Sequence, residues 1–386
     1  MNVRNYYVKF KKIGSENNCS AGFVRFLKYL KLRVSYKVSM QDFFSERLYD
    51  KSVDHFAYFN SLHTAIHKWA YVRPRFVPNA TVCKRIFMQV DYYICKLLYP
   101  GLDAMDYFRY EFYNIGHSKR REFITEGYLV KMDRYFNGGA EKIADVNLLR
   151  DKGRFNEKFK DFVQRKWILT KGVSQTEFES FCLGLDKVIV KPIDGGAGHG
   201  VHIVELNFAD DVAALYEEVK NTNSIVEEVI VQHDDIRRLN PSSVNTIRVY
   251  SVLYNGEVYI TGATLRIGCG DTPIDNYSAG GVAAEIDVDS GLVISPAVSQ
   301  NAEKYLVHPY SNAPIKGLQI PFWQDIIANV KSAHALIPRL GYIGWDVAVC
   351  ADNTITFLEA NTCSGVALQQ HPGLKGKKPV YMQFMK

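Results

Sequence analysis

Alternating apolar and polar positions predict two strands joined by a glycine-rich loop in residues 188–205, which read VIVKPIDGGAGHGVHIVE. The first apolar run ends at Lys191, and a second alternating run begins at Val201. The β-branched side chains after the loop favour a strand over a helix. We therefore expect a hairpin in which a glycine loop directly follows a strand that ends in a lysine.

Residues 344–365, GWDVAVCADNTITFLEANTCSG, predict a second pair of strands that carry a few polar residues among apolar ones. One strand carries Asp346, and the next carries Glu359 and Asn361. A spacing of two places the Glu359 and Asn361 side chains on one face of their strand. This stretch therefore supplies three oxygen ligands of the kind that a hard cation prefers.

The rest of the chain divides into a helical first part and a strand-rich second part. Residues 41–145 show helical spacing with many aromatic positions, and the pattern changes near Val146. Asn255 and Gly256, between two alternating runs, are a strong hairpin signal. The expected helices are 151–165, 176–183, 210–220 and 323–336; the expected strands are 167–170, 224–230, 246–254, 257–267, 282–288, 343–350 and 354–360. We expect an α+β protein with a helical region at 1–145, a glycine-loop lobe at 146–230 and a carboxylate-bearing lobe at 231–386.

Composition and charge fit a globular protein with two or three domains. Hydrophobic residues make up 47% of the 386 positions and charged residues 23%, so a large core can form under a polar surface. The formal charge of +6 suits an anionic substrate and equally a solvated surface. Seven cysteines without a CxxC pair predict reduced thiols rather than a zinc site. We expect no nucleic-acid partner.

The first 40 residues are basic, with nine lysines and arginines against the single acid Glu16. Within them, residues 22–34 place four apolar side chains on one helical face: Phe23, Phe26, Leu27 and Leu30. Such a helix either packs on the protein body, which is the more common case, or lies on an anionic membrane surface. The chain shows neither a signal-peptide core nor an apolar run of membrane-spanning length. We expect a cytoplasmic protein, with peripheral membrane contact through residues 1–40 as the alternative.

The glycine loop matches neither of the common nucleotide fingerprints. A dinucleotide-binding GxGxxG must open a helix, whereas this loop leads into the strand-like VHIVELN. The Walker signature also fails, because no GK[ST] closes the loop. A glycine loop between antiparallel strands instead offers backbone N–H groups over phosphates, as in protein kinases, but the HRD and DFG signatures are missing. With a preceding lysine and three downstream oxygen ligands, the residues favour ATP with Mg²⁺, and Mn²⁺ as a substitute.

Together these residues resemble the ATP-grasp superfamily, and more closely its sugar-transfer-associated branch. The resemblance runs from about Asp151 to the C-terminus and is weaker in the aromatic helical region before it. It implies an ATP-grasp fold, in which two α+β lobes clasp ATP. In the sequence, an aromatic-rich helical N-terminal region precedes this fold. The resemblance also implies a function in polysaccharide biosynthesis, in which residues 1–40 would contact the glycan-assembly proteins.

The resemblance assigns two lysines and the loop to the phosphates of ATP. Lys191 in VIVKP corresponds to the lysine before the flap, and Lys152 in RDKG to an earlier one. The flap itself contributes Gly195, Gly196, Gly198 and Gly200. Asp346, Glu359 and Asn361 reproduce the Asp…Glu-x-Asn pattern that bridges Mg²⁺ to the phosphates. A glycine follows Ser364, where many relatives have proline.

The resemblance also implies a hinge, a ribose contact and catalytic side chains. The hinge, whose backbone and first carboxylate meet the adenine amino group, corresponds to Glu227, Glu228, Val229 and Ile230. Asp235, or its neighbour Asp234, is expected to hold the ribose. The residues expected beside the γ-phosphate and the acyl-phosphate intermediate are Arg248, Arg266 and Asn276.

The reaction implied is ATP-dependent joining of a carboxylate to an amine through an acyl phosphate. We expect a small-molecule or glycan carboxylate, such as a uronic acid, and an amine acceptor in surface-glycan synthesis. One alternative is a phosphotransferase on the same fold that passes phosphate to a sugar hydroxyl. Another is a non-catalytic nucleotide-binding module, but intact Lys191, Asp346 and Glu359 argue against it.

Overall fold

The computed structural model describes residues 69–99, 101–193, 200–271, 275, 277 and 280–385. The predicted basic helix at 22–34 therefore lies outside the described residues, and so do four predicted site residues: Gly195, Gly196, Gly198 and Asn276. The chain forms two compact units, Met1–Ile115 and Gly116–Lys386. We describe each unit by itself.

The described part of the first unit is helical and rich in aromatic contacts. A helix at 69–76 is followed by α5 (Val82–Leu98), α6 (Ala104–Arg109) and the 3-10 turn η1 (Phe112–Asn114). The ring of Tyr107 packs edge-on against Tyr92, with 5.4 Å between centroids, and its hydroxyl donates to buried Asp91 at 2.9 Å. The helical, aromatic-rich prediction is confirmed for this part of the chain.

The second unit begins with a series of short helices: α7 (His117–Arg120), α8 (Glu126–Asn137), η2 (Ala140–Lys142), α9 (Ile143–Arg150) and α10 (Lys152–Lys158). Helix α10 begins where Asp151 accepts a hydrogen bond from the backbone amide of Arg154 at 2.9 Å. A side chain that caps in this way satisfies one of the free amides at a helix start. The cap fixes Lys152 at the first position of α10.

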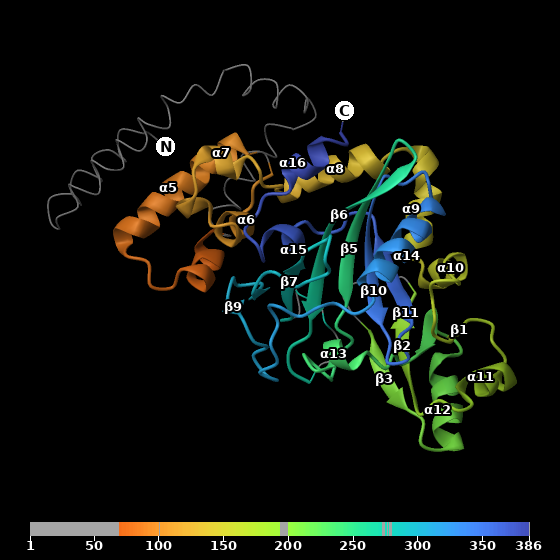
Figure 1. Cartoon of the computed structure of the whole chain (residues 1–386). Helices are drawn as coiled ribbons and strands as arrows, with labels where there is room; N and C mark the ends of the chain where they lie inside the picture. Colours follow the sequence, from red (N-terminus) through yellow and green to blue (C-terminus); the bar gives the residue numbers. More distant parts are fainter. Residues whose placement is uncertain are drawn as a thin grey trace. The chain divides into compact units, whose positions relative to one another are not determined.

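A four-stranded antiparallel sheet with two helices forms what we call the small lobe. Its strand order is β1 (Trp167–Leu169), β4 (Ser224–Glu228), β2 (Lys187–Pro192) and β3 (His202–Glu205). Helices α11 (Gln175–Cys182) and α12 (Ala209–Val219) pack on it through a core that includes Phe178, Leu215 and Val226. Figure 1 shows both helices beside this sheet. The loop between β2 and β3 is the predicted glycine flap.

A seven-stranded antiparallel sheet forms the large lobe. Its order is β11 (Ile355–Asn361), β10 (Tyr342–Val349), β5 (Ile247–Tyr254), β6 (Glu257–Ile267), β7 (Val282–Ile286), β8 (Ala297–Ser299) and β9 (Lys304–Tyr305). The β5–β6 hairpin turns at Asn255 and Gly256, both with positive φ, as the sequence predicts. Helix α14 (Trp323–Ala335) lies along the sheet (Figure 1), and three short helices complete the lobe: α13 (Asp234–Arg237), α15 (Ala367–Gln370) and α16 (Lys378–Met382).

The two faces of the large sheet differ in chemistry. Ile247 and Val249 of β5 point into the apolar core shared with α14, together with Trp345 of β10. Because side chains alternate along a strand, Arg248 and Tyr250 face the other way. The second face therefore carries Arg248, one of the predicted site residues.

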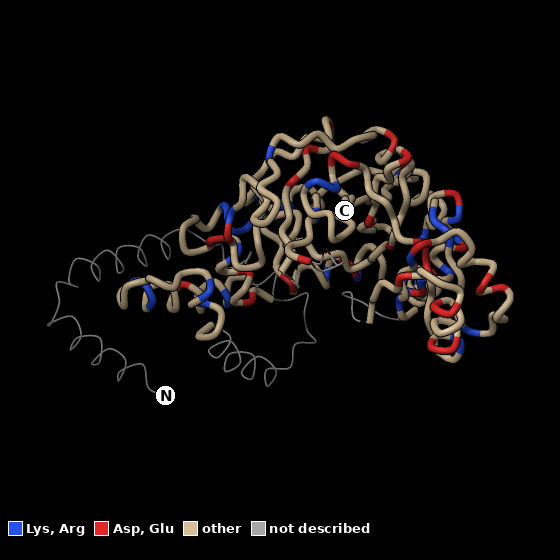
Figure 2. Tube along the Cα trace, turned by 90° about the horizontal axis from the view of Figure 1, so that it is seen from below, with Lys and Arg blue, Asp and Glu red and all other residues tan. Residues whose placement is uncertain are grey.

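Charged residues of both signs are interleaved along the described chain, as Figure 2 shows. In the same part of the chain, no helix combines the length and the hydropathy needed to cross a bilayer.

Candidate functional site

Two lysines reach the point where the glycine flap begins. Lys152 donates hydrogen bonds to the backbone carbonyls of Pro192 (2.8 Å) and Ile193 (3.2 Å). Lys191 directly precedes Pro192 on β2, and its side chain is 16% exposed. The structure therefore brings both predicted lysines to the base of the flap, although they lie 39 positions apart in the sequence.

A buried carboxylate accepts from three side chains beside this point. Glu227, 1% exposed on β4, binds the ammonium group of Lys191 at 2.5 Å through Oε2. Its Oε1 accepts from Arg165 Nη2 at 2.8 Å and from Asn156 Nδ2 at 2.9 Å. Burial opposes ionisation, but the charges of Arg165 and Lys191 outweigh it and hold the pKa of Glu227 far below its usual value. Glu227 is therefore a fixed anion inside the protein.

This geometry bears on the predicted role of Glu227 in the hinge. Both carboxylate oxygens of Glu227 accept hydrogen bonds within the protein, and its contact with the adenine amino group stays a prediction. Sequence reasoning also missed Arg165 and Asn156. Arg165 additionally donates to the carbonyl of Phe357 on β11 at 2.6 Å and so ties the small lobe to the large sheet. The only sequence signal for Arg165 is its place just before β1, the antiparallel partner of β4.

The other predicted hinge residues, Val229 and Ile230, lie between two backbone anchors. The amide of Glu228 donates to the Lys166 carbonyl at 2.9 Å, and the Glu228 carboxylate accepts from the Lys166 amide at 3.1 Å. The carbonyl of Val231 accepts at 2.8 Å from the turn between β10 and β11. The backbone of 229–230 is thus held between the two lobes.

The two candidates for the ribose contact begin α13. Asp234 is 93% exposed and lies 3.8 Å from Arg237, whereas Asp235 is 52% exposed and lies 3.9 Å from Arg238. Both carboxylates are on the surface a few residues after the hinge. The prediction for Asp235 stays a prediction, with Asp234 beside it.

Gly200, the last flap glycine, is the described member of that group. Its φ is +74°, a conformation that residues with a side chain rarely adopt. A Cβ atom there would also approach Pro192 Cγ to 2.9 Å. Position 200 therefore requires glycine where the two ends of the flap meet.

Five charged side chains form what we call the arginine–carboxylate cluster: Arg248, Arg266, Asp275, Asp346 and Glu359. Asp346 on β10 lies opposite both Arg248 on β5 and Glu359 on β11. Arg248 contacts Asp346 through Nε and Nη2, with 2.5 Å between Nη2 and Oδ2. Arg266 Nη1 donates to the same Asp346 oxygen at 2.7 Å, and its Nη2 donates to Asp275 at 3.1 Å. The two predicted arginines and the predicted aspartate are therefore brought together.

The arginines of the cluster stabilise the ionised form of Asp346. Asp346 is 2% exposed, and burial opposes its ionisation, yet Arg248 and Arg266 lower its pKa to about 2. Arg248 also donates to Ser364 Oγ at 2.7 Å. Desolvation and the nearby Asp346 have the opposite effect on Glu359 and raise its pKa. Glu359 is therefore compensated less closely than Asp346 is, because its nearest arginine nitrogen, Arg248 Nη2, lies 3.6 Å away.

The three predicted metal ligands share one edge of the sheet. Glu359 Oε1 accepts from Asn361 Nδ2 at 3.0 Å and lies 3.6 Å from Arg248 Nη2, and its side chain is 47% exposed. Two carboxylates and an amide oxygen are suitable donors for Mg²⁺. No group of three or more His, Cys, Asp or Glu side chains is placed to hold a metal in the described residues. The donor types suit Mg²⁺, but both Asp346 oxygens accept from Arg248 and Arg266, so the assignment of these three residues to Mg²⁺ stays a prediction.

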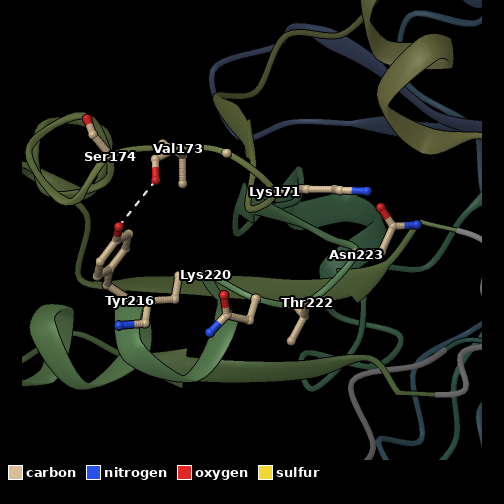
Figure 3. Close-up of a pocket in the computed structure, with 9 residues that line it drawn as sticks. Lys171, Val173, Ser174, Tyr216, Lys220, Thr222 and Asn223 are labelled. Carbon is tan, nitrogen blue, oxygen red and sulfur yellow. Dashed lines mark hydrogen bonds between the residues drawn. The ribbon is translucent and has the colours of Figure 1, made fainter.

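A separate hollow of about 530 Å³ lies in the small lobe between the segment before α11 and the C-terminal end of α12 (Figure 3). Its wall includes Tyr216, whose hydroxyl donates to the Val173 carbonyl at 3.2 Å. Its lining consists of Lys171, Gly172, Val173, Ser174, Tyr216, Lys220, Asn221, Thr222 and Asn223. None of these is a predicted site residue, so we place the candidate site at the flap lysines and the arginine–carboxylate cluster.

Comparison with known proteins identifies the family. The profile of the family described as sugar-transfer associated ATP-grasp matches residues 157–384, more than half of the chain and all of the described site residues except Lys152 and Asn156. A search of curated protein sequences gives no match.

The fold search returns ATP-grasp enzymes at low identity. The ATP-grasp ligase PsnB, solved with a minimal precursor, Mg and ADP, is 13% identical over 68% of this chain and 66% of its own, with a TM-score of 0.38. The L-amino acid ligase of Bacillus licheniformis is 13% identical over 62% and 48%, with a TM-score of 0.37. N5-carboxyaminoimidazole synthase of Aspergillus clavatus, with ADP and its ribonucleotide, is 12% identical over 57% and 46%, with a TM-score of 0.36.

The chain thus spans between about half and two thirds of the length of these solved proteins. The profile match and the two antiparallel sheets with a glycine loop between β2 and β3 agree with one another. The chain belongs to the sugar-transfer associated ATP-grasp family.

Proposed function

We propose that this protein is an ATP- and Mg²⁺-dependent ligase that joins a carboxylate to an amine through an acyl phosphate. The observation that carries the proposal is the pair of arginines, Arg248 and Arg266, held on one sheet face by their shared partner Asp346. Both are nearly buried, at 7% and 9% exposure. Rigid cations in a desolvated site stabilise the charge that develops on a transferring phosphoryl group.

The flap lysines and the hinge account for nucleotide binding in this proposal. Lys152 and Lys191 supply positive charge where the flap begins, and the flap backbone covers the phosphates. The anchored backbone of Val229 and Ile230 meets the adenine edge, since the Glu227 side chain is occupied by its own partners. Mg²⁺ held by Asp346, Glu359 and Asn361 would neutralise the triphosphate.

The chemistry then follows from the residues around the arginines. A substrate carboxylate oxygen attacks the γ-phosphorus, the bond from that phosphorus to ADP breaks, and an acyl phosphate forms. An amine next attacks the acyl carbon, inorganic phosphate leaves, and the amine loses a proton to solvent. Arg248 and Arg266 orient the carboxylate and stabilise the oxyanion of the second step.

A carboxylate nucleophile suits this site better than a sugar hydroxyl does. A hydroxyl needs a base to take its proton, whereas a carboxylate is already an anion at neutral pH. In the described cluster, Asp346 and Asp275 accept from arginines, and Glu359 accepts from Asn361. Two of these carboxylates are thus paired with arginines, and Glu359 is assigned to Mg²⁺ in this proposal, which favours the ligase over the phosphotransferase.

The family description supports sugar-related substrates. The family is described as sugar-transfer associated. Among sugar-related molecules, uronic acids offer a carboxylate, and amino sugars offer an amine, as amino acids also do. We therefore propose amide formation on a glycan or glycan precursor during the assembly or modification of a surface polysaccharide. The arginine pair supports an anionic substrate of this kind.

The test is an ADP-release screen with uronic acids and amines, followed by mass analysis of the product. For any active pair, the carboxylate is labelled with heavy oxygen. An acyl-phosphate ligase transfers one labelled oxygen from the carboxylate to the released phosphate. Phosphate attached to an acceptor, with the label retained in the carboxylate, would instead establish a phosphotransferase.

A further inference from the structure

Tyr250 carries a buried hydroxyl that is unusual in this fold. The residue is 0% exposed on β5, and among the described residues its hydroxyl has no hydrogen-bond partner. Native structures leave few buried polar groups unpaired, because each such group forfeits its hydration without compensation. A phenylalanine would fill the same apolar surroundings without that cost. The hydroxyl therefore calls for a role other than packing.

Two other tyrosines in the same core have hydroxyls that form hydrogen bonds. The Tyr342 hydroxyl donates to the Ser364 carbonyl at 3.1 Å. The Tyr381 hydroxyl donates to Gln369 Oε1 at 2.7 Å and accepts from Thr261 at 3.1 Å. All three tyrosines belong to one hydrophobic cluster. Tyr250 thus stands apart from Tyr342 and Tyr381 in hydrogen bonding alone.

The position of Tyr250 joins it to the arginine–carboxylate cluster. It stands two residues after Arg248 on the same strand and therefore on the same face. Its register partners on both sides are glycines, Gly344 on β10 and Gly262 on β6. Its hydroxyl interacts electrostatically with Arg248, Asp346 and Arg266.

A second unpaired atom lies in the same cluster. Arg266 uses Nη1 on Asp346 and Nη2 on Asp275, but its buried Nε has no partner in the described part of the chain. An arginine Nε can only donate. Burial, the largest influence on Tyr250, raises the pKa of its hydroxyl, so this group keeps its proton and can donate as well. The Tyr250 hydroxyl and Arg266 Nε are thus two unpaired donors in a cluster that also holds Arg248, and such donors suit an acceptor with anionic oxygens.

We propose that the Tyr250 hydroxyl and Arg266 Nε form an anion subsite that binds an oxygen of the substrate carboxylate or of the transferring phosphoryl group. This assignment rests on the proposed ligase function and adds Tyr250 as a substrate-binding residue. The ligand enters from the edge where the Glu359 side chain is 47% exposed. Both sources offer the same chemistry, an anionic oxygen that only accepts hydrogen bonds.

The test compares Tyr250→Phe with Tyr381→Phe in the full chain. Binding of inorganic phosphate and of glucuronate is titrated separately, each with and without MgADP, and thermal unfolding is followed for each protein. We expect Tyr250→Phe to unfold at the same or a higher temperature than the wild type. It should bind at least one of the two anions about tenfold more weakly, as for loss of a hydrogen bond to a charged group. The weakened anion identifies whether phosphoryl or carboxylate oxygen occupies the subsite.

Tyr381→Phe provides the matched control, since it removes a hydroxyl that is fully bonded within the core. It should unfold at a lower temperature and bind both anions as the wild type does. Wild-type affinity of Tyr250→Phe for both anions would overturn the proposal, and so would a wild type that binds neither. A wild type that fails to bind MgADP contradicts the ligase function, while the anion titrations without nucleotide still decide the role of Tyr250.

Discussion

The ammonium group of Lys191 on β2 lies 2.5 Å from the carboxylate of Glu227 on the neighbouring strand β4. Glu227 shares its single negative charge with a second cation, Arg165. The group of three therefore keeps one net positive charge. Because Lys191 is the member next to the flap, that excess charge lies where a triphosphate would bind.

Replacing Lys191 by alanine should weaken MgATP binding at least tenfold, equivalent to about 1.4 kcal/mol. The fold should survive, because Glu227 keeps its contacts with Arg165 and Asn156. A calorimetric titration measures the change. Lys187→Ala, at the exposed start of the same strand, is the matched control and should bind MgATP normally. Equal affinities for the two variants would remove Lys191 from the nucleotide site.

Glu227→Gln should destabilise the protein at neutral pH by about 3 kcal/mol, because it breaks a buried ion group and leaves Arg165 and Lys191 without their anion. The pKa of Glu227 is depressed in the folded state, so its stabilisation is complete above the unfolded pKa of about 4.3. It is lost as the pH falls through the depressed folded value. Denaturant unfolding from neutral to acidic pH should therefore show a shallower decline for Glu227→Gln than for the wild type.

Asp346 also has a depressed pKa, but it is present in both proteins, so the difference between the two curves isolates Glu227. Glu228→Gln, on the adjacent and less buried position, should follow the wild-type curve. Parallel curves for Glu227→Gln and the wild type would mean that Glu227 does not change its pKa on folding.

Local sequence patterns predicted the strands of both lobes except the short β8 and β9, because the alternation of apolar and polar residues is a property of neighbours in the chain. They also selected Asp346 and Glu359, since charges inside apolar strands stand out, whereas Arg248 and Arg266 were selected by the family resemblance. The missed residues depend on partners that are distant in sequence. Arg165 meets Glu227 62 positions away, and nothing near either residue encodes that pairing.

Tyr250 was missed for a different reason. A tyrosine in a strand is a common core residue, and only the packed structure shows that its hydroxyl lacks a partner among the described residues. The partners of the Glu227 side chain were missed in the same way. A buried acid next to the hinge was visible in the sequence, but the three donors that occupy it come from α10, the segment before β1, and β2.

The hinge should favour ATP over GTP by at least about tenfold. The adenine amino group donates and suits a backbone carbonyl acceptor between Glu228 and Val231. Guanine carries a carbonyl at that position, so two acceptors would face each other and both would lose hydration without compensation. Competition of ATP and GTP for the site measures the ratio. Equal affinities would place the purine elsewhere than against this backbone.

Deletion of residues 1–145 should give insoluble or unfolded protein. It removes α8, whose Leu129, Met132 and Phe136 pack in the hydrophobic cluster with Tyr342 of β10. It also removes Asn137, which donates to the Tyr342 carbonyl at 2.7 Å. Exposure of that apolar face would favour aggregation.

Deletion of residues 1–115 is the informative counterpart, because it leaves the second compact unit, Gly116–Lys386, entire. This fragment should be soluble and should bind MgATP. The measurements are the soluble yield and a nucleotide titration for both fragments. A soluble, ATP-binding fragment that starts at residue 146 would show that α8 is dispensable for the large lobe.

Glu359→Gln should abolish turnover while nucleotide binding survives in part. The substitution removes a hard anionic oxygen from the proposed Mg²⁺ site, and Asn361 offers only a neutral carbonyl in its place. Lys152, Lys191 and the hinge remain to hold ATP. ADP release at saturating substrate and a nucleotide titration separate the two effects. Asn361→Ala should be milder and partly rescued by raised Mg²⁺, and the double variant should lose little more than Glu359→Gln.

The same substitution should stabilise the metal-free protein at neutral pH. Desolvation and Asp346 raise the pKa of Glu359 in the folded state, so the ionised form that prevails at neutral pH is disfavoured by folding. Its unfavourable contribution appears as the pH rises through the folded pKa and is absent in acid, where the group is protonated in both states. A glutamine carries no charge and escapes this cost, while it can still accept from Asn361.

Adding Mg²⁺ should raise the unfolding temperature of the wild type and reverse the order of the two proteins. Glu205→Gln, an exposed position on β3, should behave as the wild type throughout. Near-normal ADP release by Glu359→Gln, or the same Mg²⁺ response as the wild type, would contradict both the metal assignment and the ligase mechanism built on it.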